Sequence, residues 1–237
     1  MGCYFKNKNE YREDGTLKSR QTFFGDKFQR HEYYDFVSIE NPIQILEYSV
    51  DGKQCIKRTN FYKHGKQIVK YIDGNQELWT KWGENGKLKH EKIFLNNKEH
   101  GKWLFYYDNG NIKLEENYLD GKKHGLFKDY YLNNILKSEK SYLNSEFHGN
   151  CIMWFDNGQI YIHRNYVNGK LDGFFKVWNE KGILIQNNRF KEDKWHGVST
   201  WFNDNGGFEK ATNFDNGIKL EKVWNYDGKL HFVKYKI

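Results

Sequence analysis

The sequence predicts an all-β protein in which β-hairpins stack into an elongated, single-layer antiparallel sheet with a 24-residue period. Three observations predict it: a His-Gly or Asp-Gly dipeptide recurs at a fixed step, aromatic positions keep the same step, and each copy has two turn signals. A fixed period in this range is typical of repeat architectures. The dipeptide occurs at His100-Gly101, His124-Gly125, His148-Gly149, Asp172-Gly173 and His196-Gly197, 24 residues apart each time.

Each copy has the pattern of a β-hairpin. In one copy, residues 102–107 (KWLFYY) are aromatic and prone to form a strand, and residues 112–119 (IKLEENYL) form a second strand-like run. Asp108-Asn109-Gly110 lies between them, and Asn-Gly supplies the positive φ angles that tight hairpin turns need. This turn recurs at Asn85-Gly86, Asn157-Gly158 and Asn205-Gly206, with Asn134 and Gly182 in the same slot of other copies.

A second turn joins each copy to the next, at Asp120-Gly121, Asn168-Gly169 and Asn216-Gly217. Because strand, turn, strand and turn repeat without a crossover, every strand can pair with its neighbours in an antiparallel meander. One first-strand position is aromatic in every copy, which predicts packing between adjacent hairpins. These residues are Tyr106, Tyr130, Trp154, Trp178 and Phe202; the second strand has Tyr118, Tyr142, Tyr166, Phe190 and Phe214.

These motifs resemble MORN-type repeats, in the bacterial variant found in the YwqK family of antitoxins. The residues of the resemblance are Asn109-Gly110, Tyr118, Asp120-Gly121 and Lys123-His124-Gly125, with their equivalents in the following copies, and it covers Trp82 to Gly217. It implies an array of hairpins that binds a partner protein and, for the antitoxins, neutralises a toxin. Such repeats serve many partners, and a fold does not determine a function.

The period divides the chain into three parts of one continuous array. Residues 76–219 contain the regular copies. Residues 1–75 are expected to form degenerate hairpins and an N-terminal cap, and residues 220–237 to form C-terminal capping strands, with His231 to Ile237 as the last strand. Terminal copies are irregular in repeat proteins because they lack a neighbour on one side.

Within the N-terminal part, the hairpin pattern is recognisable near the start. Tyr11 to Lys18 (YREDGTLK) matches the turn and strand at Trp82 to Lys89 (WGENGKLK). The pattern lapses between Phe36 and Val50, where Asn41-Pro42 is expected to be a loop or edge position because proline cannot donate to a strand ladder.

The composition favours a thin sheet without a deep core. Aromatic residues make up 18% of the chain, and their rings bury a large area while keeping a polar edge in water. The formal charge of +7 raises the possibility of a nucleic acid or an anionic lipid as partner. However, the lysines are spread over all copies beside glutamates, with no run of five like charges, so a solvated surface is the preferred interpretation.

The cysteines Cys3, Cys55 and Cys151 lack the spacing of a metal site, so we expect reduced thiols in a cytoplasmic protein. No apolar run is long enough for a signal peptide or a membrane span. Met1-Gly2-Cys3 looks like the start of a lipidated protein, but Lys6 stands where myristoylation requires Ser or Thr, which argues against an anchor.

The recurrent histidines do not predict a metal site. Equivalent residues of adjacent hairpins are separated by two strands, on the order of 10 Å, whereas imidazoles that share a zinc ion must each lie about 2 Å from it. We expect His100, His124, His148 and His196 to be turn residues with local hydrogen bonds, and Asp172 to fill the same role. No metal and no cofactor is expected.

Motifs of catalysis are missing from the sequence. His31-Glu32-Tyr33-Tyr34-Asp35 approaches a zinc-protease signature, but Asp35 replaces the second histidine and the segment has the pattern of a strand instead of a helix. No phosphate-binding loop, nucleophile elbow or distinct carboxylate pair is present. The sequence therefore predicts a protein that is not an enzyme.

Aromatic side chains of the first strand are the candidate binding residues. Alternation sends Leu104 and Tyr106 to one face of the sheet and the residues between and beside them to the other. This second face varies from copy to copy, so it can be shaped for one partner, and Trp and Tyr are favoured interface anchors. Alternatively, these rings only cover the sheet, and both interpretations remain open. The candidates are Trp103, Phe105, Tyr107, Phe127, Phe175 and Trp201.

The preferred function is a protein-binding module of the antitoxin or immunity type, whose partner would be a toxin encoded nearby. A membrane-surface scaffold that binds anionic lipids is one alternative, and co-sedimentation with anionic liposomes tests it. Single-stranded nucleic acid binding through stacked aromatics and lysines is the other, and it requires an affinity that falls steeply with added salt.

Overall fold

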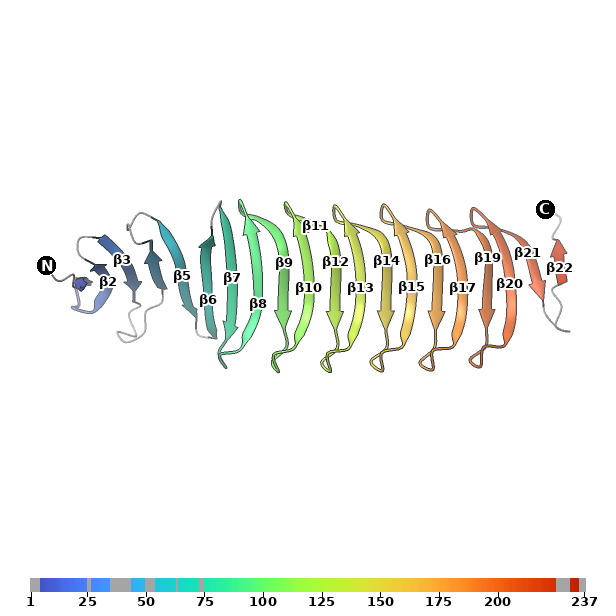
Figure 1. The fold of residues 1–237 in the computed structure, drawn as a ribbon, viewed down its shortest axis with the longest axis horizontal. Coiled ribbons are helices and arrows are strands. Elements are labelled where there is room, and N and C mark those ends of the chain that lie inside the picture. Colours follow the sequence, from blue (N-terminus) through green and yellow to red (C-terminus); the bar gives the residue numbers. More distant parts are fainter. Residues whose placement is uncertain are drawn as a thin grey trace. The chain divides into compact units, whose positions relative to one another are not determined.

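The computed structural model describes residues 5–24, 27–34, 44–49, 54–62, 64–72, 75–224 and 231–234. These residues form strands and turns, and none of them forms a helix. The chain divides into two units, Met1–Asn111 and Ile112–Ile237. In each unit the strands lie side by side in chain order (Figure 1), which confirms the predicted all-β sheet of stacked hairpins.

The first unit is an antiparallel meander in which each strand pairs with the next one along the chain. Its strands are β1 (Phe5–Tyr11), β2 (Leu17–Phe24), β3 (Lys27–Tyr33), β4 (Gln44–Tyr48), β5 (Cys55–Tyr62), β6 (Gly65–Ile72), β7 (Gln76–Gly83), β8 (Leu88–Leu95) and β9 (Lys98–Tyr106).

The second unit continues the same pattern of antiparallel neighbours. Its strands are β10 (Ile112–Leu119), β11 (Lys122–Lys123), β12 (Gly125–Tyr130), β13 (Leu136–Leu143), β14 (Glu146–Trp154), β15 (Ile160–Val167), β16 (Lys170–Trp178), β17 (Leu184–Lys191), β18 (Lys194–Trp195), β19 (Gly197–Phe202), β20 (Phe208–Asp215), β21 (Ile218–Trp224) and β22 (His231–Lys234).

Two expectations for the irregular ends are confirmed. The turn after β1 has the same hydrogen bonds as the turn after β7: Gly15 N donates to Arg12 O at 3.0 Å, and Gly86 N donates to Gly83 O at 3.0 Å. A final strand forms at β22. Strand β4 lies in the segment where the repeat pattern lapses, and Asn41-Pro42, the expected loop or edge position, lies outside the described residues. The boundaries at residues 75 and 219 remain predictions.

The Asn-Gly turns differ from the expected geometry. In the turn after β9, only Gly110 has a positive φ, at 92°, and Asn109 instead accepts a hydrogen bond from Asn111 N at 3.0 Å through its side-chain oxygen. Tyr107 N donates to Asn111 O at 2.9 Å, so the loop has three residues with one left-handed position. Asparagine is therefore used here for its side-chain hydrogen bond, and only glycine for its φ.

The second kind of turn is the tight two-residue turn. Asp120 and Gly121 both have positive φ, at 51° and 83°, as two-residue hairpin loops require. These turns also link to the strand that follows the previous turn, because Ser145 N donates to Lys123 O and Gly169 N donates to Phe147 O, both at 2.8 Å. Backbone hydrogen bonds thus continue from hairpin to hairpin beyond the strand ladders.

The two faces of the sheet in the second unit differ in burial. Residues directly opposite each other on paired strands share a face, so Phe127, Lys140 and Cys151 lie on one face. We call it the ring face, because it bears a row of aromatic rings. It contains nearly all the buried side chains of this unit, namely Phe127, Ser138, Cys151, Val177, Asn188, Ser199 and Thr212.

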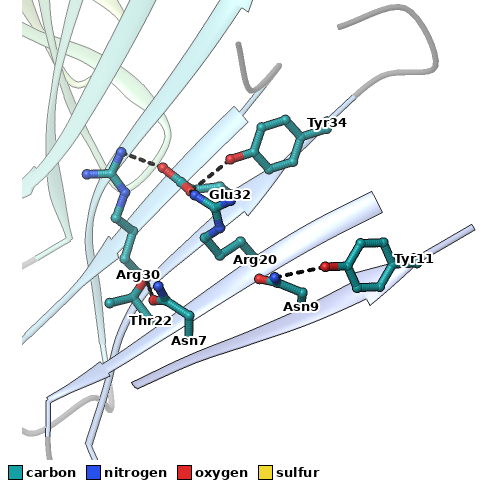
Figure 2. A network of polar contacts seen from close by, with 8 residues as sticks. All are labelled: Asn7, Asn9, Tyr11, Arg20, Thr22, Arg30, Glu32 and Tyr34. Atoms are coloured by element: carbon teal, nitrogen blue, oxygen red, sulfur yellow. Dashed lines mark hydrogen bonds and ion pairs between the residues drawn. The ribbon is translucent and has the colours of Figure 1, made fainter. Parts of the chain in front are cut away.

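The first unit has a polar network on one face of β1 to β3 (Figure 2). Glu32 accepts hydrogen bonds from Arg30 at 2.7 Å and from the Tyr34 hydroxyl at 2.9 Å, and lies 3.8 Å from Arg20. The Glu32 side chain is only 12% exposed, so these partners offset the cost of burying its charge. Neighbouring strands are also joined by a hydrogen bond from Thr22 to Asn7 at 3.0 Å.

Candidate functional site

Two of the six candidate binding residues are buried. Trp103 is 7% exposed and Phe127 is 8% exposed. The Trp103 indole donates to Ile93 O at 2.8 Å, and its ring lies 5.1 Å from the ring of Phe94. The indole N–H and the ring of Trp103 are therefore already engaged within the chain. The burial of Trp103 and Phe127 favours the packing interpretation for these two residues.

The other four candidates are half-buried. Phe105 lies 5.8 Å from the ring of His90, and Phe175 lies 5.8 Å from Phe190. Trp201 packs against Trp195 and under the Lys210 ammonium group. Tyr107 lies in the turn after β9. The structure thus places five candidates among contacts with neighbouring rings, while binding by any of the six stays a prediction.

Rings on the ring face form a ladder that crosses the copies of the second unit. Successive centroids from Tyr118 to Phe127, Tyr142, Phe147 and Tyr166 are 5.5, 4.7, 4.6 and 5.0 Å apart. Aromatic pairs at such distances stabilise beyond their buried area. Since a single-layer sheet has no second layer to cover it, side chains on this face bury one another.

Cations are part of this ladder. The Lys123 ammonium group lies 5.3 Å from the ring centres of both Phe127 and Tyr142, and the Arg164 guanidinium group lies 5.5 Å from Tyr166. Cation–π contacts of this kind keep the charges on ring surfaces within the chain. The ring face is therefore best explained by the stability of the array.

The opposite face, which we call the open face, has the opposite character. Its strand positions alternate with those of the ring face, as the pairing of Leu126 with Ser141 and of His163 with Lys176 shows. Several apolar side chains on it are exposed to solvent, whereas nearly all the buried side chains of this unit lie on the ring face. The exposed apolar residues of the open face include Leu119, Leu126, Leu143, Tyr161, Val167, Val198 and Ile218.

These residues were missed among the sequence candidates, although a signal was present. Leu119, Leu143 and Val167 are 24 residues apart and end successive second strands. Alternation places them on the face of Tyr106 and its equivalents. The sequence prediction favours aromatic residues, because Trp and Tyr are common interface anchors, and so does not include these aliphatic residues.

The aromatic column on the open face combines packing with hydrogen bonding. The Tyr130 hydroxyl donates to Glu115 at 2.8 Å, and Tyr106 donates to Glu91 at 2.7 Å. Burial, followed by the hydrogen bond to Glu115, raises the pKa of Tyr130 to about 12. This is consistent with the predicted contact between neighbouring strands, with the hydroxyl kept protonated at neutral pH.

His100-Gly101 and His148-Gly149 lie inside strands, and His124 and His196 each lie between two short strands of one hairpin arm, so the prediction of turn residues is wrong. The register of β14 shifts opposite β13 between Lys140 and Tyr142, and Gly149 has a φ of 89° there. An added Cβ would lie at an ordinary contact distance of 3.5 Å from Ser141, so glycine is required here by its φ and not by lack of space. Glycine with positive φ is typical of both turns and bulges, so the dipeptide alone could not distinguish them.

The histidine side chains of these bulges face the following turn. His148 Nδ1 accepts from Asn168 N at 3.5 Å, and in the next copy the Asp172 carboxylate accepts from Glu192 N at 3.4 Å. Asp172 therefore replaces histidine in the same acceptor role. The described residues contain no group of three His, Cys, Asp or Glu side chains arranged to hold a metal ion.

Titratable groups with shifted pKa values are explained by packing. Burial, followed by the nearby Lys92, lowers the pKa of His90 to about 4. Burial also raises the pKa of the Cys55 thiol, which keeps it protonated and makes it a poor nucleophile. These shifts arise from desolvation in the sheet, and each of these groups fits a structural role.

Comparison with known protein families supports the repeat interpretation. Three consecutive segments, residues 99–120, 123–144 and 147–168, match the model of the MORN repeat variant. The matched segments start 24 residues apart, in agreement with the hairpin period. No curated protein matches the chain. In the part of the chain that the structure describes, no helix has the length and apolar character needed to cross a membrane.

Proposed function

We propose that this chain is a non-catalytic binding module that engages a partner protein through the open face of its second unit. The observation that supports the proposal is the exposure of apolar side chains on this face: Val198 is 53% exposed and Leu143 is 40% exposed. Apolar patches left in solvent are typical of interaction sites. The match of three segments to the MORN repeat variant fits a repeat-based binding module.

The open face also has the mixture of groups that a protein interface uses. Tyr161 and Val167 stand beside His163 on β15, and Lys128 forms an ion pair with Glu139 at 3.3 Å. Interfaces combine an apolar centre with a polar rim, and aromatic residues are enriched in them. On the ring face, by contrast, the large side chains are already used by neighbouring copies.

In its finer form, the proposal is that the partner is a toxin and that complex formation neutralises it. The support for this form is the sequence resemblance to the YwqK family of antitoxins. A toxin encoded beside this chain would arrest growth when expressed alone. Co-expression of this chain would restore growth, whereas persistent arrest despite a soluble chain would contradict the antitoxin role.

The binding function is tested by affinity capture from lysate of the source cell, with the captured protein identified by mass spectrometry and its stoichiometry measured by light scattering. The test variant combines Leu143→Asp with Val198→Asn, because other copies have Asp215 and Asn150 at these positions. The control is Leu132→Asp, an exposed apolar residue in a turn whose equivalents include Asp108 and Asp156.

We expect the unmodified chain and the Leu132→Asp control to capture the same protein in a stoichiometric complex, and the double variant to lose it. Each apolar anchor at an interface can contribute about 1–2 kcal/mol or more. Capture of nucleic acid alone, or a complex that is indifferent to the double variant, would contradict binding through the open face.

A further inference from the structure

One hairpin end of the open face bears three cationic side chains. Lys191 of β17 lies directly opposite Lys194 of β18, and Arg189 lies two residues before Lys191 on the same face. All three side chains are exposed. Among the described residues, none of them forms a side-chain hydrogen bond or an ion pair. The hairpin therefore presents three cations to solvent without internal use for them.

Lys191 is a departure from the repeat, because it places a second lysine opposite a position that is lysine in most copies. Like charges directly opposite each other destabilise a pair of strands, so folding alone does not favour this arrangement. Every other regular copy has at least one apolar partner at this pair of positions: Leu95 with Lys98, Leu119 with Lys122, Leu143 with Glu146, Val167 with Lys170, and Asp215 with Ile218.

Arg189 is a departure as well. Arg189 lies over the bulge glycine Gly197, as Ile93, Asn117, Ser141 and Asn165 lie over the bulge glycines of their copies, and the equivalent residue of the last copy is Asn213. Asn165 donates to Asp172 O at 2.8 Å, and Asn117 similarly donates to Leu126 O, so these amides hold neighbouring strands together. The longer arginine instead presents its guanidinium group to solvent beside a hollow of about 420 Å³.

The carboxylates near this hollow are mostly engaged. Asp193 accepts from Leu171 N at 2.7 Å, Asp172 accepts from Glu192 N at 3.4 Å, and Asp215 lies 3.3 Å from His196 Nδ1. Glu192 remains exposed at the turn itself. The carboxylates are thus tied to the turn and the bulge, while the cations of the open face are available to a group from outside the chain.

We propose that this hairpin end binds an acidic segment of the partner protein, an inference that rests on the proposed function. A partner carboxylate accepts hydrogen bonds from the Arg189 guanidinium group, which suits bidentate contact. Lys191 and Lys194 flank the same segment. Val198, which lines the hollow and is 53% exposed, packs against an apolar side chain next to that carboxylate.

Arg189 and Lys191 occur in one copy only, and Glu146 interrupts the column of Lys122, Lys170 and Lys194, so the arrangement favours an acidic peptide over a nucleic acid. A nucleic acid needs a positive track along several copies and stacking platforms along it. On the open face, Lys128 is instead paired with Glu139 at 3.3 Å, and the aliphatic residue Val198 lines the same hollow as Arg189 and Lys191. An acidic segment with apolar residues complements this combination.

The probe is a short fluorescein-labelled peptide of alternating Glu and Val, measured by fluorescence anisotropy, with a Lys and Val peptide for comparison. The test variant combines Arg189→Asn with Lys191→Val, which are the residues of the preceding copy, Asn165 and Val167. Lys176→Thr is the control, because it removes a cation of the same face and introduces the residue of the next copy, Thr200. Thermal unfolding checks that all variants fold.

We expect the acidic peptide to bind the unmodified chain and the control with equal affinity. The double variant should bind it at least about tenfold more weakly. Its affinity should fall with added salt, and the basic peptide should not bind. Equal affinity in the double variant would overturn the proposal, as would displacement of the peptide by oligothymidylate at lower concentration than by unlabelled peptide.

The same double variant separates this inference from the proposed function. If it captures the cellular partner as tightly as the unmodified chain does, the acidic-segment inference is wrong while protein binding stands. If the partner is lost both in this variant and in the variant that combines Leu143→Asp with Val198→Asn, the acidic-segment inference and the proposed function are both supported.

Discussion

Removal of one ring from the ladder should weaken several copies at once. The Phe147 ring lies 4.6 Å from Tyr142 and 5.0 Å from Tyr166, with interplanar angles of 29° and 27°. Phe→Ala in a full core costs about 3–5 kcal/mol, and Phe147 is half-buried, which halves this figure to about 2 kcal/mol. Two lost ring pairs add about 0.5 kcal/mol each at the lower end of their range. We therefore expect Phe147→Ala to lower the free energy of unfolding by about 2–3 kcal/mol.

Urea unfolding followed by circular dichroism measures this loss, and amide hydrogen exchange localises it. Stability in repeat proteins is approximately a sum of nearest-neighbour contributions, so protection should fall most in β13, β14 and β15. The control is Phe147→Leu, which introduces the residue of the next copy, Leu171, and keeps most of the apolar area. It should cost less than about half as much as the alanine variant.

A loss below about 0.5 kcal/mol in Phe147→Ala would refute the reasoning, because changes of that size are usual at surface positions without special contacts. A loss of protection confined to β14 would also contradict it, since the ring contacts residues on the strands before and after.

Three further predictions concern charge. Lys191→Leu should raise the free energy of unfolding by about 0.2–1 kcal/mol, because it removes the like-charge pair with Lys194; a decrease in a urea titration would contradict this account. Glu32→Gln should lower the free energy of unfolding by about 1–2 kcal/mol at neutral pH, because charged hydrogen bonds are lost at a nearly buried group. An unchanged urea midpoint would show that this network does not contribute to stability. Burial lowers the pKa of His90 to about 4, so as the pH decreases the unfolded chain binds a proton at a higher pH than the folded chain does. The free energy of unfolding should therefore fall between pH 6.5 and 4, by about 1–2 kcal/mol after allowance for solvent screening. His90→Gln introduces the residue found at the equivalent position of a later copy, Gln186, and should flatten that part of the pH profile.

Much of the fold follows from period and alternation in the sequence. The step that links Tyr118, Tyr142 and Tyr166 predicts their shared environment, and they lie in one ladder on the ring face. Alternation also places Trp103 and Phe105 correctly on one face. The family comparison supports the repeat in residues 99–168 and leaves the partner open.

Other features depend on information that a local pattern lacks. His148-Gly149 looks like a turn, but its φ is used by a bulge, and its hydrogen-bond partner Asn168 lies in the following turn. Similarly, large rings such as Trp103 suggest binding anchors, yet a sheet without a second layer buries its largest side chains against each other. Only the three-dimensional arrangement shows that smaller side chains such as Leu143 remain exposed.

Arg189, Lys191 and Lys194 illustrate a third kind of limit. A repeat pattern emphasises what the copies share, whereas Arg189 and Lys191 differ from the equivalent residues of neighbouring copies. Cross-strand pairing is needed to see that Lys191 and Lys194 lie opposite each other.

The central claim, that the open face of the second unit is the binding face, is tested most directly by site-specific photo-cross-linking in the source cell. A photoreactive phenylalanine at Val198 samples the open face, and the same residue at Lys210 samples an exposed position of the ring face. We predict that one protein cross-links at Val198 and that none does at Lys210. Cross-linking of that protein at Lys210 without any product at Val198 would contradict the account.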